Sequence, residues 1–224
     1  MSPPPSSYSA VPRKVSKAAS TLGYASSQYC HWLTEGLPRL IYLRQHLPPG
    51  LYTLLLPDIP RALESLTALA SLTKGMGPFH SVVTVAPHEA IQVGELWSVE
   101  LPVGKGVKAN GNAVRAVRGI FGGKVRKGGG ALVWIVRKER RSATNEAGVT
   151  TALKMMAKKR GMDFVAFDGE ENDFESTLSV FGEAGIVVGV HGAGLANVVF
   201  CREDVKVVEI GMEEVSASDV AERD

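Results

Sequence analysis

The sequence predicts an α/β fold in which short buried strands alternate with helices. Along the 224 residues, short β-branched or aliphatic runs recur and amphipathic stretches separate them. This alternation is typical of parallel sheets with helices packed on their faces. In addition, the glycine-bounded apolar run 185–190 leads through a turn of small residues into a second apolar segment. Such a strand–turn–helix connection lies at the ligand-binding edge of α/β sheets.

The composition is that of an ordinary globular protein, with 45% hydrophobic and 21% charged residues. The net charge is only +2, but eleven basic residues and one acid lie between Lys105 and Arg141. A basic region suits nucleic acid, an anionic membrane or a phosphorylated small molecule. Because aromatic residues are few there and no nucleic-acid motif occurs, we expect the phosphorylated ligand. No window approaches the run of about 20 apolar residues that a membrane helix needs, so no span is expected in this chain.

The first half is predicted to be a partial α/β domain, residues 21–101, that follows a tail. Residues 1–20 are rich in Pro, Ser and Ala and contain no acid, which predicts a disordered basic tail. A helical pattern follows, in which Pro38 should bend or loosen the helix. Asp58 is available to cap the next helix. The helices are expected at 27–46 and 60–73, and the strands at 51–56, 81–85 and 95–101.

The second half, residues 112–224, is predicted to be a Rossmann-like half-domain. A Gly/Lys-rich linker, residues 102–111, precedes it. The glycine-rich basic segment 121–130 is predicted to be a mobile surface loop. The strands are expected at 131–136, 163–167, 186–190 and 205–210, and the helices at 112–120, 145–160, 173–183 and 195–200.

The turn after residues 186–190 is the strongest candidate site. His191, Gly192, Ala193 and Gly194 carry little side-chain bulk apart from the imidazole. At such a turn, free backbone N–H groups surround a concavity that suits a phosphate or carboxylate, and the imidazole adds a donor. The alternative is a plain strand-to-helix turn in which glycine only permits tight geometry.

Three segments, in matching order, resemble the motifs of one known family. One comprises His191-Gly-Ala-Gly194-Leu-Ala-Asn197 and the later Val205-Lys-Val-Val-Glu209-Ile. The others are His31-Trp-Leu-Thr-Glu35-Gly-Leu-Pro-Arg39 and the arginine-rich residues 137–146. Together they span roughly residues 28–211. The chain thereby resembles glycosyltransferase family 61, which includes plant xylosyl- and arabinosyltransferases, EGF-domain O-GlcNAc transferases and bacterial polysaccharide enzymes.

The resemblance implies an inverting, metal-independent glycosyltransferase with a GT-B-like fold. In that fold two Rossmann-like domains face a cleft, and here the N-terminal domain would be incomplete. The donor would be a nucleotide sugar such as UDP-xylose, UDP-arabinose or UDP-GlcNAc, and the acceptor a hydroxyl of a glycan or glycoprotein. Eukaryotic relatives work in the Golgi and secretory pathway and bacterial ones in the cytoplasm, so the compartment stays open.

Donor binding is expected at the carboxyl edge of the second sheet. Two arginines follow a strand there, and the guanidinium fork matches phosphate oxygens. The resemblance assigns them to the diphosphate, although Val136 stands where the family often has serine. Glu209 would accept hydrogen bonds from ribose hydroxyls, and Asn197 would contact the sugar or cap the turn. The alternative to donor binding is that these side chains are solvated on the surface and have no ligand. The expected donor-binding residues are Arg137, Arg141, His191, Gly192, Ala193, Gly194, Asn197 and Glu209.

The catalytic base is expected from the N-terminal domain. His31, Glu35 and Arg39 are spaced by four residues, so they share one helix face. An imidazole titrates near neutrality and suits general-base work. Glu35 would orient it or take the proton itself, and Arg39 would pair with Glu35. The alternative is a solvated polar stripe on an amphipathic helix.

No cofactor or metal ion is expected. The chain contains no Asp-x-Asp pair, and the acidic run 168–175 is predicted to be a solvated loop. Arginines and a helix N-terminus can neutralise a diphosphate leaving group instead. Cys30 and Cys201 lack the spacing of zinc ligands, so free thiols are expected.

Other functions fit the sequence less well. A dinucleotide-binding oxidoreductase would need a third glycine where Asn197 stands. A serine hydrolase would need a Gly-x-Ser-x-Gly elbow, which does not occur. A non-catalytic or truncated nucleotide-binding α/β module remains the alternative, because the N-terminal region is short.

Overall fold

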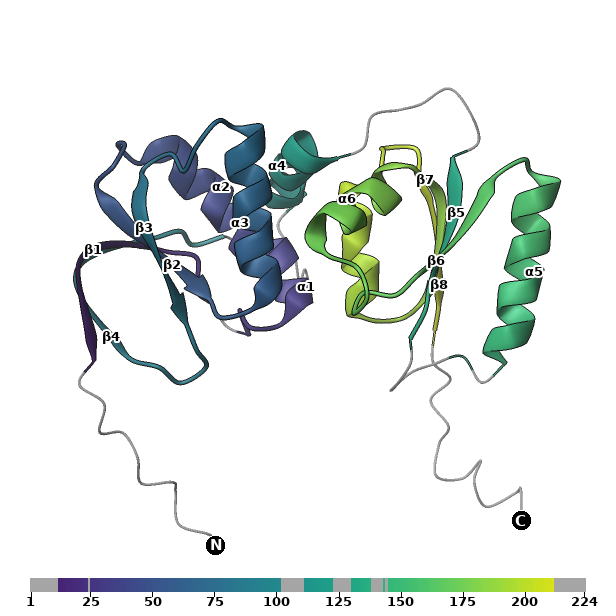
Figure 1. Ribbon diagram of the computed structural model, residues 1–224, viewed down its shortest axis with the longest axis horizontal. Coiled ribbons are helices and arrows are strands. Elements are labelled where there is room, and N and C mark those ends of the chain that lie inside the picture. Colours follow the sequence, from purple (N-terminus) through teal and green to yellow (C-terminus); the bar gives the residue numbers. More distant parts are fainter. Residues whose placement is uncertain are drawn as a thin grey trace, which may run out of the picture. The chain divides into compact units, whose positions relative to one another are not determined.

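The computed structural model describes residues 12–23, 25–101, 111–122, 130–137, 143 and 145–211. The chain divides into two compact units, Met1–Ala113 and Val114–Asp224. Each unit contains a four-stranded parallel sheet (Figure 1). The predicted α/β class is therefore confirmed. The GT-B arrangement of the two units stays a prediction.

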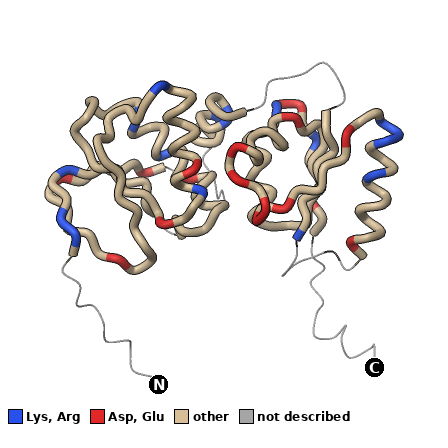
Figure 2. The backbone as a smooth tube through the Cα atoms, in the orientation of Figure 1, with Lys and Arg blue, Asp and Glu red and all other residues tan. Residues whose placement is uncertain are grey.

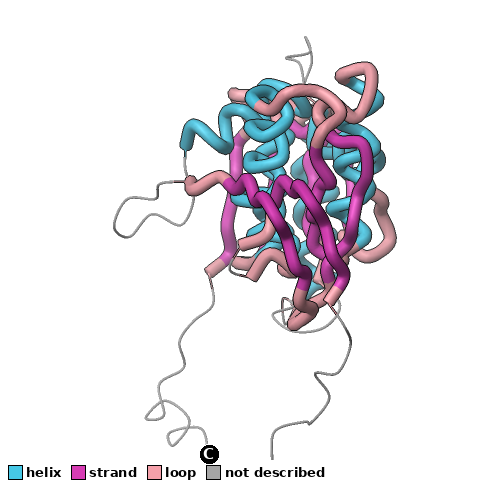
Figure 3. Tube along the Cα trace, turned by 90° about the vertical axis from the view of Figure 1, so that its left-hand side faces the viewer, coloured by secondary structure: helices cyan, strands magenta, loops and turns pink. Residues whose placement is uncertain are grey.

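The first sheet has the strand order β3-β2-β1-β4. Strand β2 supplies its centre, because every one of its residues is buried. On the face turned to the viewer in Figure 3, no described helix covers the strands of this sheet. The sequence predicts the position of β2 closely, whereas the last strand begins earlier than expected. The strands are β1 Arg13–Ser20, β2 Tyr52–Pro57, β3 Phe79–Val85 and β4 Ile91–Ser98.

Residues 13–20, which the composition predicts to be part of a disordered tail, instead form β1. Two of its basic side chains are paired with acids near or within β4: Arg13 Nη2 lies 2.6 Å from Glu89 and Lys17 Nζ lies 3.1 Å from Glu95. The strand ends in small side chains that are buried in the core. The prediction is wrong because the segment pairs with strands β2 and β4, and the acids that pair with Arg13 and Lys17 lie more than 70 residues away in sequence. The preceding residues 1–11 lie outside the described residues.

One continuous helical segment follows, as predicted for residues 27–46. It comprises α1 Tyr29–His31, the π-helical turn η1 Trp32–Gly36 and α2 Leu37–His46. In the π turn the Leu37 N–H donates to the Trp32 carbonyl. Pro38 lies next and has no N–H to donate, so the helix loosens where the proline predicts it.

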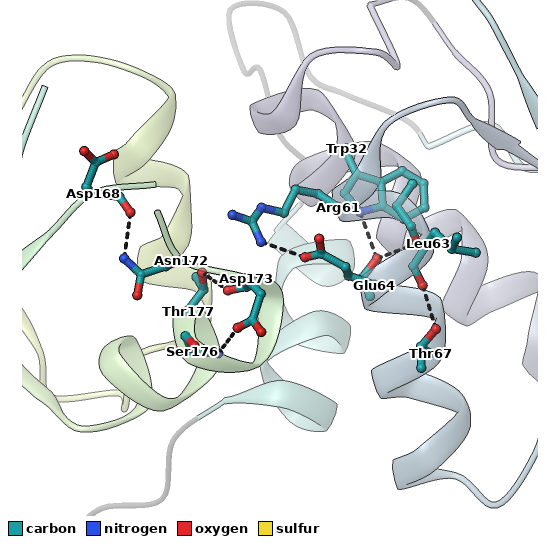
Figure 4. A network of polar contacts seen from close by, with 12 residues as sticks. Trp32, Arg61, Leu63, Glu64, Thr67, Asp168, Asn172, Asp173, Ser176 and Thr177 are labelled. Atoms are coloured by element: carbon teal, nitrogen blue, oxygen red, sulfur yellow. Dashed lines mark hydrogen bonds and ion pairs between the residues drawn. The ribbon is translucent and has the colours of Figure 1, made fainter. Parts of the chain in front are cut away.

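Helix α3 spans Pro60–Leu72 and packs near η1. The buried Trp32 indole donates to Ser65 Oγ over 3.0 Å, which fixes the two elements together (Figure 4). The predicted N-cap, Asp58, is wrong: the N-cap is Ile59, which has no side-chain cap. Asp58 lies one residue too early because its own N–H still donates to the Val85 carbonyl at the edge of the sheet.

The second sheet has the order β6-β5-β7-β8, and its four strands alternate with helices as predicted. The arrangement is consistent with a Rossmann-like half-domain. Strand β5 is completely buried at its centre. The strands are β5 Ala131–Ile135, β6 Asp163–Phe167, β7 Ala184–Val190 and β8 Lys206–Ile210.

Helices cover both faces of this sheet. On one face, α5 Glu146–Lys159 packs over a cluster that includes Trp134 and Val188. On the other, the rings of Phe121, Phe174 and Phe200 meet edge to face at 5.4–6.2 Å. These rings come from α4 Gly111–Phe121, α6 Phe174–Gly182 and the 3₁₀ helix η2 Ala193–Phe200.

The acidic run 168–175 comprises the loop before α6 and the first two residues of that helix, and acidic residues gather there (Figure 2). Most of its residues are exposed, as predicted for a solvated loop, and hydrogen bonds order it. Asp173 caps α6, because its Oδ1 atom accepts from the Ser176 N–H over 2.8 Å (Figure 4). Asn172 donates to the Asp168 carbonyl over 2.7 Å. The loop therefore serves the start of a helix.

Three predicted features fall on residues whose structure is not described. The linker 102–111 is described only at Gly111, which begins α4. The basic loop 121–130 is described only at its ends, and the arginine-rich segment only at Arg137, Ala143, Asn145 and Glu146. Within the described part of the chain, no helix is long and apolar enough to cross a membrane.

Candidate functional site

The turn at the carboxyl end of β7 is built as a continuation of the sheet. The His191 N–H donates to the Ile210 carbonyl over 2.9 Å, so the ladder between β7 and β8 extends one residue past Val190. The chain then turns at Gly192 and enters η2. The sequence predicts an α-helical start at 195, but a 3₁₀ helix begins at Ala193. The first N–H groups of a helix have no acceptor within it, so this end suits an anion.

Different contacts explain why glycine occupies positions 192 and 194 of the turn. Gly192 has φ 153°, a conformation that residues with a side chain rarely adopt, and a β-carbon there would collide with Arg137 Nη1. At Gly194 a β-carbon would lie 2.9 Å from Ile135 Cγ2, at the end of β5. The tight geometry predicted for this turn is therefore present. Gly192 is required by its backbone conformation, and the Arg137 side chain also occupies the space beside it.

Arg137 lies at this turn, as the sequence predicts. It follows β5 by two residues, and its Nη1 donates to the His191 carbonyl over 3.1 Å. A guanidinium has five N–H donors, so the contact with His191 leaves others to bind a ligand. Arg141, the second predicted diphosphate ligand, lies outside the described residues.

Glu209 is close to the turn but holds a partner that the sequence does not predict. Its Oε1 lies 2.6 Å from His191 Nδ1. Both side chains are largely exposed, His191 at 60% and Glu209 at 50%. Glu209, which is predicted to accept hydrogen bonds from the ribose, is thus hydrogen-bonded to His191, which is predicted to donate a hydrogen bond to the anion.

The remaining predicted donor-side residues differ in exposure. Ala193 is exposed at the start of η2, and its backbone belongs to the anion-facing end of that helix. Asn197 is only 2% exposed. Of the two roles left open by the sequence, sugar contact and support of the turn, this burial favours support.

In the first unit, His31, Glu35 and Arg39 lie on one helix face, as their spacing predicts. Glu35 Oε1 lies 2.7 Å from His31 Nδ1, and its other oxygen lies 3.5 Å from Arg39 Nη2. Arg39 is anchored by a 3.0 Å hydrogen bond from Nε to the Val99 carbonyl. The carboxylate therefore orients the imidazole and is itself held by an anchored guanidinium.

Tyr29 precedes His31 on the same segment and has a different character. Burial raises the pKa of its phenol well above the ordinary value of about 10, while Arg61 lowers it in part. Arg61 forms a 2.6 Å ion pair with Glu64 on α3 (Figure 4). Tyr29 therefore stays protonated at neutral pH, and His31 with Glu35 is the better candidate for a base.

The two cysteines are free, as predicted, and Cys201 is completely buried. Burial raises the pKa of its thiol to about 12, although the nearby Arg118 lowers it in part. Arg118 also donates to the Val198 carbonyl near the end of η2. No group of three metal-binding side chains occurs among the residues that the structure describes.

Comparison with known families identifies the chain. The family model for Glycosyltransferase 61 matches residues 29–208, far more than half of the sequence. The chain therefore belongs to glycosyltransferase family 61. The matched region includes His31, Arg137 and His191 and extends to the residue before Glu209. The comparison with curated proteins gives no match.

Proposed function

We propose that this protein transfers a sugar from a UDP-sugar to a hydroxyl of a glycan or glycoprotein, with inversion and without a metal ion. Family membership supports glycosyl transfer in general and implies a sugar donor and an acceptor. The observation that supports the finer proposal is the meeting of Arg137 and His191 at the start of η2. A cationic fork, an imidazole and unpaired helix N–H groups together suit a diphosphate.

Of the groups of the donor, the diphosphate is the one that the cationic and N–H groups of this turn suit best. Negative charge develops on it as the bond to the sugar breaks, and fixed positive groups stabilise that charge more in the transition state than in the ground state. Arg137 and His191 would supply part of this charge, and Arg141 would add to it. No divalent ion is then required to release the nucleoside diphosphate.

The acceptor hydroxyl needs a base, and His31 is the proposed one. Glu35 Oε1 lies 2.7 Å from Nδ1, and we assign Nε2 of the neutral ring as the atom that takes the proton from the acceptor. As the acceptor oxygen bonds to the anomeric carbon, the carbon–phosphate oxygen bond breaks on the opposite face, and the hydroxyl proton passes to His31. This single displacement inverts the anomeric configuration. It requires the two units to face each other across a cleft, as in a GT-B enzyme.

The sugar and acceptor are proposed only as classes. The resemblance to plant and animal members supports UDP-xylose, UDP-arabinose or UDP-GlcNAc as donors. A few side chains of the sugar pocket decide between them, because one methylene changes binding by about 1–3 kcal/mol and a hydrogen-bonded hydroxyl by more.

An activity assay tests the proposal. UDP release from each of the three UDP-sugars would be measured with and without glycan acceptors, in the presence of EDTA, for wild type and His31→Ala. We expect acceptor-dependent release that EDTA does not affect and that His31→Ala reduces by about 10²–10⁴-fold. Release that occurs only with added divalent ions would overturn the metal-independent mechanism. UDP binding without turnover of any donor would favour a non-catalytic nucleotide-binding module.

A further inference from the structure

Glu209 and His191 are brought together by the register of the second sheet. In this parallel ladder Ile135 pairs with Gly189, and Gly189 pairs with Glu209, so the three form one row across the carboxyl edge. A β-carbon at Gly189 would lie 3.2 Å from Ile135 and 3.3 Å from Leu195 of η2. The row therefore faces η2.

His191 continues the same face. Residues two apart in a strand point to the same side of the sheet, and the His191 N–H is still bonded in the ladder with β8. Its imidazole thus belongs to the η2 side, next to Glu209. The 2.6 Å hydrogen bond between Nδ1 and Oε1 follows from these backbone positions.

The pairing fixes which ring nitrogen is available to a ligand. A carboxylate can only accept, so the hydrogen must be on Nδ1 of His191. Nε2 is then the atom left to face the solvent-exposed turn. It accepts a hydrogen bond when the ring is neutral and donates one when the ring is protonated, and only the protonated ring suits a phosphate oxygen.

The charges around the ring are few in the described part of the chain. β7 and η2 contain no ionisable side chain, β8 contains Lys206 at its start and Glu209 near its end, and Arg137 follows β5. Glu209 thus places a negative charge beside the ring, and Arg137 places a positive charge at the same turn.

We propose that Glu209 is a positioning residue that acts on the donor through His191 and does not itself contact the ribose. It keeps the hydrogen on Nδ1 and presents Nε2 to the diphosphate. This inference rests on the proposed function, because it takes the ligand of the turn to be the diphosphate of a nucleotide sugar.

Ligands with and without a ribose separate the two roles. Pyrophosphate and UDP would be titrated by calorimetry into wild type, Glu209→Ala, His191→Ala and the double variant, with Glu203→Ala, an exposed acid before β8, as the matched control. We expect Glu209→Ala to weaken both ligands by the same factor, about tenfold, and the double variant to bind no more weakly than His191→Ala. Unchanged affinity for pyrophosphate with weaker UDP binding would overturn the proposal in favour of a ribose contact.

An NMR measurement tests the pairing without any ligand. Long-range ¹H–¹⁵N spectra report which ring nitrogen carries the hydrogen in each of the five histidines, and His191→Gln assigns the relevant signal. We expect the Nδ1–H form in wild type and in Glu209→Gln, whose amide oxygen still accepts, and the Nε2–H form in Glu209→Ala. The same tautomer in wild type and Glu209→Ala would overturn the proposal. Absence of UDP binding by wild type would instead contradict the proposed function, and the spectra would still decide the role of Glu209 toward His191.

Discussion

The guanidinium of Arg137 lies so close to Gly192 that a β-carbon at this position would collide with its Nη1 atom. The same Nη1 donates to the carbonyl of His191, the preceding residue. One arginine therefore both shapes the turn after β7 and places positive charge at it. The backbone of the turn and the cation that we assign to the donor form a single structural unit.

Gly192→Ala is expected to lower the free energy of unfolding by about 1–3 kcal/mol, because it adds strain at φ 153° and displaces Arg137. Gly211→Ala is the matched control, since its β-carbon meets no atom within 4 Å. Its effect should stay within about 0.5 kcal/mol. Urea unfolding of both variants measures the difference, and equal effects would contradict the requirement for glycine at position 192.

Glu35→Gln is expected to slow transfer by about tenfold or more while leaving UDP affinity unchanged. The reason is that Glu35 contacts the His31 ring, which we propose acts on the acceptor and not on the donor. His46→Ala removes an exposed histidine at the end of the same helical segment and serves as control. Steady-state kinetics with UDP-binding assays decide the case: a fall in UDP affinity would place Glu35 on the donor side.

Asp173→Ala is expected to destabilise the protein by about 1 kcal/mol, because it removes the cap of α6. Asp58→Ala should cost far less, since Asp58 is exposed and does not cap α3. Thermal unfolding of the two variants compares a real cap with one that only the sequence pattern predicts. Equal destabilisation would contradict the assignment of the caps.

Stability is expected to fall at alkaline pH in part because of Cys201. The pKa of its thiol is raised from 9.0 to about 12 in the folded protein, so the unfolded state loses this proton first as the pH rises. The contribution is fully present below about pH 9 and is lost between about pH 9 and 12, at up to about 1.4 kcal/mol per pH unit. Denaturant unfolding of wild type and Cys201→Ala across this range should show a shallower decline in the variant. Parallel declines would contradict the shift.

The second sheet could be predicted almost completely from the sequence. Strands β5 and β7 are continuous apolar runs, because parallel strands covered on both faces need apolar side chains throughout. The face shared by His31, Glu35 and Arg39 was equally accessible, since it depends only on local helix geometry. Predictions succeeded where the determinants lie within one segment.

The other features depend on contacts between distant segments. Strand β1 pairs with β2 and β4, its ion pairs are with residues that follow β3 in sequence, and its own composition resembles a tail. The hydrogen bond between His191 and Glu209 depends on the register of β7 and β8. Asp58 failed as a cap because its backbone is still bound to the sheet. The residue pattern within one segment cannot predict these contacts.

The central claim is that the turn after β7 binds the diphosphate of a UDP-sugar without a metal ion. The most direct test is calorimetric titration of UDP in EDTA into wild type, His191→Ala and Arg137→Ala, with His88→Ala as a control in the first unit. We expect saturable binding by wild type and the control, and affinities at least about tenfold weaker in the two turn variants, because each loses a charge-assisted hydrogen bond. Equal UDP affinity in all four proteins, or binding by wild type only when a divalent ion is added, would contradict the account.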